Sequence, residues 1–424
     1  MKEEFLHYLW RTHKWINSNL KTTDHRNLEV IYSGDYNEDQ GPDFSYAKLS
    51  IDGTVWIGQV EMHLSSSDWN RHHHSIDAHY HNVILHVVWI HDEEIIVNGN
   101  VLPTLELKNY ITDQDVIRYK QLIECEDRIP CEKLFANVPS HVIISQMENA
   151  SIHRLQQKTL KFKKELESTQ QDWEEVFYKN LCKYLVTPPN ADSMEVLTTK
   201  ISWRLIQKIK SELTDLEALF FGVAGMLNAS SEESYVLELQ NNYSLLAHKY
   251  NLSPMNVQNW HFLRLRPSHF PSLRLAQLAS FFHFVDRPLA YLLEIADLAE
   301  ARKVLIMEPS DYWRNHYQLG RPSTQPGNHR LGNSTKDVLF INVVIPLIYM
   351  YGTQNSNESQ VSKALNWLEI IKSENNIYTR LWRELGFKPE NARHSQACIQ
   401  QYKIFCQNKK CLECKIGHYI LSQG

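Results

Sequence analysis

The first part of the chain has apolar and polar residues arranged as in β-strands, preceded by one helix. Asp52-Gly53, between the second and third apolar runs, is typical of a two-residue hairpin. Glu3–Asn17 carries apolar residues at helical spacing. The runs rich in β-forming residues, separated by turn residues or by a polar stretch, are Leu28–Tyr32, Phe44–Ile51, Val55–Leu64, Val83–Ile90 and Ile95–Val97.

From about residue 112 the spacing of apolar residues becomes helical. The expected helices are Val116–Leu122, Val142–Leu166, Trp173–Leu185, Met194–Leu213 and Leu216–Leu227. The pattern predicts an α+β protein with three consecutive parts. These are a mixed α/β domain over residues 1–115, a large all-α region over 116–385 and a basic, cysteine-containing segment over 386–424.

The composition is that of a globular protein, with 424 residues, 43% hydrophobic, 22% charged and a net charge of −5. Val338–Tyr351 is shorter than the roughly 20 residues of a membrane span, so we expect it to be buried and expect no membrane association. The N-terminus lacks the apolar core of a signal peptide. Seven cysteines without such a signal favour free thiols or metal ligands in a cytoplasmic protein.

Charge is unevenly distributed along the chain. Residues 1–115 contain 8 Lys and Arg against 18 Asp and Glu, whereas residues 386–424 contain 6 against 2. The chain as a whole is therefore not a polybasic nucleic-acid binder. The basic tail could still contact phosphates through Lys403, Lys409, Lys410 and Lys415.

Two carboxylates and an imidazole are expected on one face of the sheet. Glu61 and His63 are two residues apart on a strand and therefore share a face. Asp43 opens the preceding strand of the hairpin, and antiparallel pairing would bring it beside Glu61. Such a set could bind Mg²⁺ or Mn²⁺, activate water and stabilise charge on a phosphoryl oxygen. The alternative is that Asp43 caps a turn and Glu61 pairs with a nearby histidine on an exposed face.

The order of helix, strand, Pro-Asp strand, Glu-x-His strand, helix and strand resembles the PD-(D/E)XK nuclease core, a restriction-endonuclease-like fold. The resemblance implies that Asp43 and Glu61 bind the metal and that His63 stands where the family has a water-assisting lysine. Gln59, on the same face, would support this set. Because imidazole is largely neutral at pH 7, His63 would act as a base or ligand rather than as a constant cation.

Nearly the whole chain also resembles an uncharacterised bacterial family of unknown function. That resemblance implies membership and no activity. The motifs that carry it are Gly41–Phe44, Val60–His63, Ser67–Trp69, Val83–Val88, Leu216–Leu227, Arg266–Pro271 and the C-terminal cysteines.

Histidine is concentrated after the Glu-x-His strand, with eight of the 21 histidines between residues 61 and 91. We expect His72–His74 to lie in a solvated loop and His86 to be a hydrogen-bonded core residue of an apolar strand. If Asp77 begins a helix, His81 shares its face, and the two could support a metal or a substrate phosphate.

Cys406, Cys411 and Cys414 lie within nine residues and could bind Zn²⁺ or an iron–sulfur cluster. Some nucleases of the PD-(D/E)XK superfamily hold such a cluster with one upstream and three C-terminal cysteines. The alternative is that the thiols stay reduced and pack a terminal helix. The candidates for a fourth ligand are Cys398, His418, Cys125 and Cys131.

Arg264 and Arg266, on either side of Leu265 and before Pro267, suggest a phosphate-binding loop, with helix capping or pairing with acids as the alternative. Taken together, the sequence predicts a metal-dependent nuclease or phosphodiesterase that acts on nucleic acid through Asp43, Glu61 and His63. The alternative is a non-catalytic nucleic-acid-binding or assembly protein that keeps a nuclease-like scaffold. The substrate and the oligomeric state are left open.

Overall fold

The computed structural model describes the chain except residues 16–18, 38, 229, 325, 328 and 424. The fold is α+β, as predicted, with a mixed sheet near the N-terminus and a large helical region. It divides into two compact units. Unit 1 consists of Met1–Glu148, Leu381–Phe387 and Ile399–Gly424, and unit 2 consists of Asn149–Arg380 and Lys388–Cys398. Residues after 398 therefore cluster with the N-terminal elements, whereas the sequence suggested three consecutive parts.

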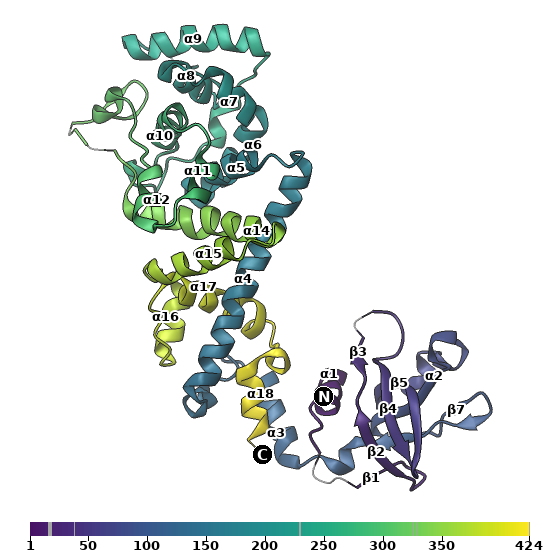
Figure 1. Cartoon of the computed structure of the whole chain (residues 1–424). Coiled ribbons are helices and arrows are strands. Elements are labelled where there is room, and N and C mark those ends of the chain that lie inside the picture. The colour runs from purple at the N-terminus through teal and green to yellow at the C-terminus, as the bar shows by residue number, and fades with distance from the viewer. Residues whose placement is uncertain (16–18, 38, 229, 325, 328, 424) are drawn as a thin grey trace. The chain divides into compact units, whose positions relative to one another are not determined.

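Unit 1 is built on a seven-stranded sheet in the order β1-β2-β4-β5-β6-β9, with β3 also paired to β4 (Figure 1). The strands from β1 to β5 pair antiparallel, whereas β6 runs parallel to both β5 and β9. The five predicted strands are confirmed. The strands of this sheet are β1 Leu20–Lys21, β2 Asn27–Tyr32, β3 Asp35–Tyr36, β4 Phe44–Ile51, β5 Thr54–Ser65, β6 Val83–Ile90 and β9 Thr104–Glu106. Strands β7 Ile96–Val97 and β8 Asn100–Val101 form a separate two-stranded sheet.

The hairpin between β4 and β5 sets the register of the sheet. Asp52 and Gly53 have φ values of 47° and 80°, and Ile51 pairs with Thr54, as the Asp-Gly signal predicts. Further along the ladder Phe44 pairs with Val60. This register brings the start of β4 next to the residue after Val60.

The connection from β5 to the parallel strand β6 contains the histidine-rich segment, folded into short helical turns. They are α2 Asp68–Arg71, η1 His74–Ile76 and η2 Ala78–Tyr80. The chain entering β6 approaches β5 closely at Gly58, where a Cβ atom would come within 2.7 Å of the Asn82 carbonyl oxygen. Glycine at this position therefore permits the close approach of the two parallel strands.

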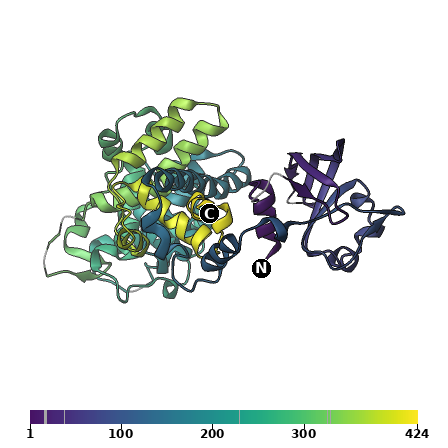
Figure 2. The same cartoon turned by 90° about the horizontal axis from the view of Figure 1, so that it is seen from below.

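Helix α1 (Glu3–Arg11) carries the apolar residues Phe5, Leu6 and Leu9 on a buried face. The Phe5 ring stacks on Tyr119 with 4.1 Å between the centroids. Figure 2 shows α1 between the sheet and the C-terminal elements of unit 1, both of which it contacts. The predicted helix over Glu3–Asn17 is shorter than expected, since α1 ends at Arg11; residues 16 and 17 lie outside the described residues.

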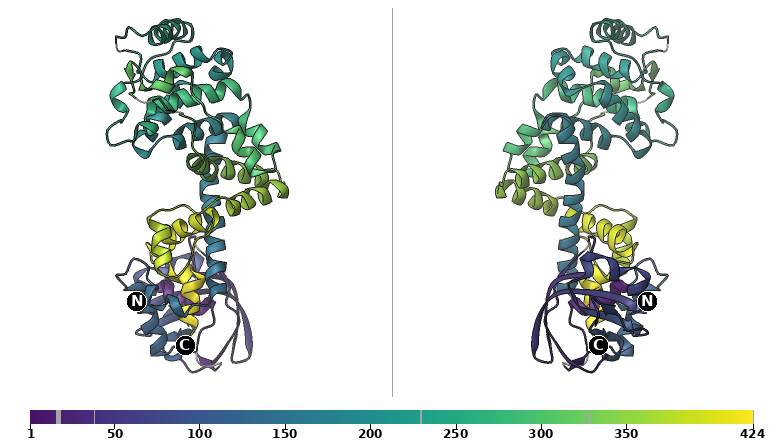
Figure 3. Two further views of the ribbon diagram at one scale, coloured as in Figure 1. Left: turned by 90° about the vertical axis from the view of Figure 1, so that its left-hand side faces the viewer. Right: turned by 90° about the vertical axis from the view of Figure 1, so that its right-hand side faces the viewer.

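The last part of the chain completes unit 1. Helix α18, coloured yellow in Figure 3, packs against α3. The bounds of the remaining elements of unit 1 are η3 Leu107–Tyr110, α3 Asp113–Ile123, η4 Glu132–Asn137, η10 Gln401–Cys406, η11 Cys411–Glu413 and α18 Lys415–Ser422.

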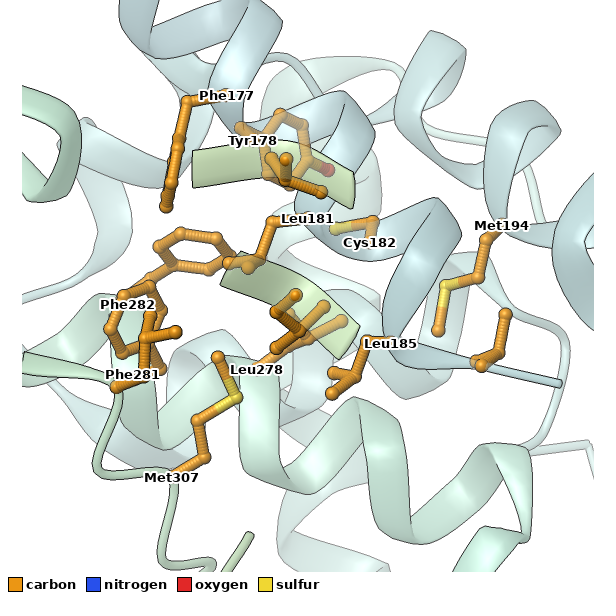
Figure 4. Packing of buried hydrophobic residues seen from close by; sticks show 14 of the residues in the cluster. Phe177, Tyr178, Leu181, Cys182, Leu185, Met194, Leu278, Phe281, Phe282 and Met307 are labelled. Carbon is orange, nitrogen blue, oxygen red and sulfur yellow. The ribbon is translucent and has the colours of Figure 1, made fainter. Parts of the chain in front are cut away.

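Unit 2 is helical around a large apolar core, part of which is drawn in Figure 4. Phe282 packs there against Tyr178 and Trp203 with ring centroids 5.5 and 5.4 Å away. The α-helices that lie wholly in unit 2 are α5 Trp173–Leu185, α6 Ala191–Lys200, α7 Trp203–Ile209, α8 Leu213–Val223, α9 Ser234–Tyr250, α10 Pro271–Phe284, α11 Pro288–Glu294, α12 Leu298–Val304, α13 Asn333–Leu339, α14 Ile345–Gln354 and α15 Glu358–Ile370. Residues of both units occur in α4 Ser140–Ser168, α16 Ile377–Glu384 and α17 Ala392–Gln400.

The predicted helix Met194–Leu213 is wrong in one respect, because it is two helices. Ile201 is extended, and the Ser202 hydroxyl accepts a hydrogen bond from the Leu205 amide, which starts α7 afresh. Serine is a favoured residue at such a helix start.

Among the described residues, one helical stretch, Asn333–Gln354, is long and apolar enough to cross a membrane. Of its apolar window, 61% is buried inside the structure. This stretch includes the predicted buried segment Val338–Tyr351 and a π-helical turn, η9 Phe340–Val344. Its apolar side chains therefore form part of the core of unit 2.

We expect Phe5→Ala to lower the free energy of unfolding of unit 1 by about 3 kcal/mol or more, because it empties a buried ring position. Hydrogen exchange of the β5 amides would measure this loss for unit 1 alone. Ile76→Ala is the matched control, since that side chain is 84% exposed and should change stability by less than about 0.5 kcal/mol. Equal exchange in both variants would contradict the packing of α1.

Candidate functional site

Asp43 and Glu61 lie side by side on adjacent strands. The Asp43 amide donates to Glu61 Oε2 at 3.1 Å, and the Met62 amide donates to Asp43 Oδ2 at 3.0 Å. The Glu61 carboxylate is thus held by the backbone amide of Asp43, and the Asp43 carboxylate by the amide of the residue after Glu61. The structure brings together the two carboxylates that the hairpin suggested.

Glu61 is buried, with 5% of its surface exposed. Burial, together with the charges of Asp43 and Glu3, raises the pKa of its carboxyl to about 9. A carboxylate in this environment needs a proton or a nearby cation, because burial removes the stabilisation by water.

Two imidazoles lie near the other oxygen of Glu61, and a third contacts one of these two rings. His63 Nε2 and His74 Nε2 each lie 3.5 Å from Glu61 Oε1, and His72 Nδ1 lies 3.2 Å from His63 Nε2. One ring nitrogen of each of the three histidines lies within 4.8 Å of the others. Tetrahedral ligands at a metal–nitrogen distance of about 2.0 Å are about 3.3 Å apart. The pair His63 Nε2 and His72 Nδ1 has this spacing.

The prediction of a solvated loop over His72–His74 is wrong for His74 and incomplete for His72. His74 is 91% buried and stacks on Tyr80 with 3.8 Å between the ring centroids. His72 is exposed, yet its ring reaches His63. His73 between them adopts a left-handed conformation with φ 61°, which ends α2 and turns the chain so that both neighbouring rings meet His63.

His86 is a hydrogen-bonded core residue, as expected, and its partner is His63. His86 Nε2 lies 2.9 Å from His63 Nδ1, which fixes the orientation of the His63 ring. Burial, together with neighbouring histidines, lowers the pKa of His63 to about 2 and that of His86 to about 3. Both rings are therefore neutral, which is the form of imidazole that binds metals.

The predicted supporting residues Gln59, Asp77 and His81 are not arranged as the sequence suggested. Gln59 Oε1 is buried without a hydrogen-bond partner among the described residues. Asp77 does not begin a helix shared with His81, because the chain forms only the three-residue turn η2 there. Asp77 instead accepts a hydrogen bond from the His79 amide and contacts the His79 ring, whereas His81 is exposed.

A residue that the sequence did not single out, His7 on α1, also reaches the site. His7 Nε2 lies 3.3 Å from Asp43 Oδ2. His7 also lines a cavity of about 480 Å³ within unit 1, whose other walls include Arg11, Tyr36 and the loop 407–410. The apolar face of α1 is the sequence signal that could have identified His7. This face must pack on the sheet, and its packing fixes the direction in which the polar residues of the helix point.

The cavity gathers basic side chains from both ends of the chain. Among the described residues, Arg11 and Lys409 have no carboxylate within 4.0 Å, whereas Lys410 is paired with Glu413 at 3.0 Å. The Arg11 guanidinium lies 5.1 Å from the centroid of the Tyr36 ring. The cavity beside Asp43 therefore offers cationic groups although the N-terminal sequence is acidic.

Arg264 and Arg266 belong to unit 2, where both are exposed before the turn η7 Pro267–His269. Arg264 has a left-handed backbone with φ 62°. Their binding of phosphate stays a prediction.

We expect Glu61→Gln and His74→Ala to weaken Mn²⁺ and Zn²⁺ binding to unit 1 by more than about 10-fold, because each removes an atom of the converging set. Isothermal titration calorimetry of the full chain measures this directly. The matched control is His73→Asn, which changes the exposed neighbour and keeps a residue that tolerates positive φ. Unchanged affinity in the first two variants would rule out a cation at these atoms.

The family model described as "Protein of unknown function (DUF2851)" matches residues 3–377, a range that contains Asp43, Glu61 and the clustered histidines. No curated protein and no solved structure matches the chain. Because the match spans most of the sequence, the chain belongs to the DUF2851 family.

Proposed function

We propose that the chain is a metal-dependent phosphodiesterase that cleaves nucleic acid at the site on β4 and β5. The observation that carries this proposal is the convergence of His63, His72 and His74, two of which lie 3.5 Å from Glu61 Oε1 beside Asp43. Carboxylates and neutral imidazoles at this spacing are typical of metal centres that act on phosphate esters.

The topology of unit 1 supports the proposal. Helix α1 is followed by the antiparallel strands β2, β4 and β5, then by a crossover with short helices and the parallel strand β6. This is the order of elements in the PD-(D/E)XK nuclease core that the sequence resembles. Under this proposal Asp43 and Glu61 would take the two acidic positions of that pattern.

The donor set fits Mn²⁺ or Zn²⁺ better than Mg²⁺, because Mg²⁺ prefers oxygen ligands and the set is rich in imidazole. A bound cation would polarise a phosphoryl oxygen and lower the pKa of a water molecule. Glu61 Oε1 and the ring nitrogens of His63, His72 and His74 would hold it, and His86 would keep the His63 ring in its orientation.

His7 is the group that we propose as proton acceptor or donor. It lines the cavity, and the Asp43 carboxylate 3.3 Å from its Nε2 can orient the ring. Arg11 and Lys409, which line the same cavity, would contact phosphates on either side of the scissile bond.

Cleavage assays with the purified full chain test this function directly. We expect labelled single-stranded DNA, duplex DNA or RNA to be cut in the presence of Mn²⁺, and cleavage to stop when EDTA is added. Asp43→Asn and Glu61→Gln should lower the rate by more than about 100-fold, because both alter the acid pair.

His73→Asn serves again as the control and should retain the wild-type rate. Salt-dependent binding of all three nucleic acids without turnover would favour the non-catalytic alternative instead. Cleavage that survives both acid-pair substitutions would show that a contaminant or another site is responsible.

A further inference from the structure

The cavity that His7 lines in unit 1 has the size of a pocket for a single small ligand. Its volume of about 480 Å³ lies within the range of about 300–1,000 Å³ that is usual for pockets enclosing one small molecule. A surface that binds many nucleotides of a strand is instead an extended basic groove. The cavity therefore fits one nucleotide, or one phosphate group, better than the middle of a long strand.

Two cationic side chains of the cavity are not neutralised by acids of its wall. Two of the four Lys and Arg side chains that line it are paired, namely Lys2 with Glu4 at 3.9 Å and Lys410 with Glu413 at 3.0 Å. The other two, Arg11 and Lys409, have no carboxylate within 4.0 Å in the part of the chain that the structure describes. The cavity therefore has an excess of two positive charges.

This charge excess matches one kind of phosphate better than another. A phosphate monoester carries a charge of about −1.5 to −2 at pH 7, whereas each phosphodiester within a strand carries a single negative charge. A nucleic-acid strand has a phosphate monoester only at an end. The two uncompensated cations therefore favour a terminal phosphate over an internal one.

Lys409 is held at the cavity wall by its own contacts. Its Nζ donates to the Ile123 carbonyl at 2.7 Å, which ties the loop 407–410 to the end of α3. An ammonium group has three N–H donors, so two are left for a ligand. The Lys409 backbone is left-handed with φ 53°, and its amide donates to the Cys406 carbonyl at 3.1 Å. The ammonium group is therefore positioned before a ligand binds.

Tyr8 contributes a hydroxyl group from a buried ring. The side chain lines the cavity and is 3% exposed, and no described residue forms a hydrogen bond with its hydroxyl. Burial, together with the charge of Asp115, raises the pKa of this hydroxyl to about 12, so it keeps its proton at neutral pH. A protonated hydroxyl on a cavity wall can donate to a phosphate oxygen.

The His7 ring connects the cavity to the candidate site. The ring lines the cavity, and its Nε2 lies 3.3 Å from Asp43 Oδ2. On the same wall the Arg11 guanidinium lies 5.1 Å from the centroid of the Tyr36 ring, a contact that helps to orient it. A phosphate in the cavity would thus be separated from Asp43 by one imidazole.

The loop 407–410 is flanked by buried residues. Cys406 and Cys411, on either side of it, are free thiols that are 7% and 8% exposed. Gln401 Nε2 lies 3.2 Å from the third predicted ligand, Cys414 Sγ. The packing of these residues fixes the ends of the loop, and their binding of Zn²⁺ or an iron–sulfur cluster stays a prediction.

We propose that this cavity binds the terminal phosphate monoester of a nucleic-acid strand through Arg11, Lys409 and the Tyr8 hydroxyl. The chain then acts from the end of a strand, and the bond that is cut lies close to that end. Of the phosphates that the two cations contact under the proposed function, the one inside the cavity is the terminal one. The identity of the ligand as a strand end rests on the proposed function, whereas the charge balance of the cavity does not.

Calorimetric titration of the full chain with short single strands of one sequence tests the proposal. The strands carry a phosphate at the 5′ end, a phosphate at the 3′ end, or hydroxyl groups at both ends, and EDTA prevents cleavage. We expect a phosphorylated strand to bind more than about 10-fold tighter than the hydroxyl strand, because the added phosphate forms charge-assisted hydrogen bonds. The strand that binds more tightly identifies the end that is recognised.

Arg11→Ala and Lys409→Ala should each remove most of this preference and leave the affinity for the hydroxyl strand within about 2-fold of its original value. Lys410→Ala is the matched control in the same loop and should keep the preference, because Lys410 is already paired with Glu413. Inorganic phosphate should compete with the phosphorylated strand in the unsubstituted chain.

Equal affinity for the three strands, or no binding of any of them, would overturn the proposal. A preference that survives Lys409→Ala would equally overturn the assigned site. Failure of the proposed function would look different, since the phosphorylated strand would still bind more tightly but would not be cut with Mn²⁺. A chain that binds and cuts all three strands equally would keep the proposed function and lose the recognition of a strand end.

Discussion

The burial of the Glu61 carboxyl in the sheet of unit 1 is the constraint on which the site depends. Because the pKa of Glu61 is raised to about 9, ionising it at neutral pH costs a few kcal/mol in the absence of a cation. The two imidazoles beside it do not offset this cost as cations, since burial lowers the pKa of both His63 and His74. A buried acid surrounded by neutral nitrogen donors is stabilised either by a proton or by a bound metal ion, and the geometry of the donors is compatible with the second.

The rest of unit 1 positions groups around this acid. The hairpin register brings Asp43 beside Glu61, and α1 adds His7. The crossover brings His74 to the Glu61 carboxylate and His72 to the His63 ring. The C-terminal elements contribute the loop 407–410 on the cavity wall. A unit assembled from three separate stretches of sequence needs long-range interactions to close, and the buried pair Gln146 and Gln401 supplies one of them.

The local elements of unit 1 could be predicted because the alternation of apolar residues and the Asp52-Gly53 turn are encoded in short segments. The proximity of Asp43 and Glu61 followed from that same register, and the core position of His86 followed from its apolar neighbours. The convergence of His72 and His74 could not be predicted, because it depends on a left-handed residue at His73 and on how the crossover packs. His7 is far in sequence from Asp43, and no local pattern specifies such a tertiary contact.

The most direct test of the central claim is pulsed electron paramagnetic resonance of Mn²⁺ bound to the full chain labelled with ¹⁵N-histidine. The account predicts hyperfine coupling to imidazole nitrogen from two or more histidines, and loss of that coupling in His74→Ala. A bound Mn²⁺ with oxygen ligands only would contradict the claim that Glu61 and the histidine cluster form a metal centre.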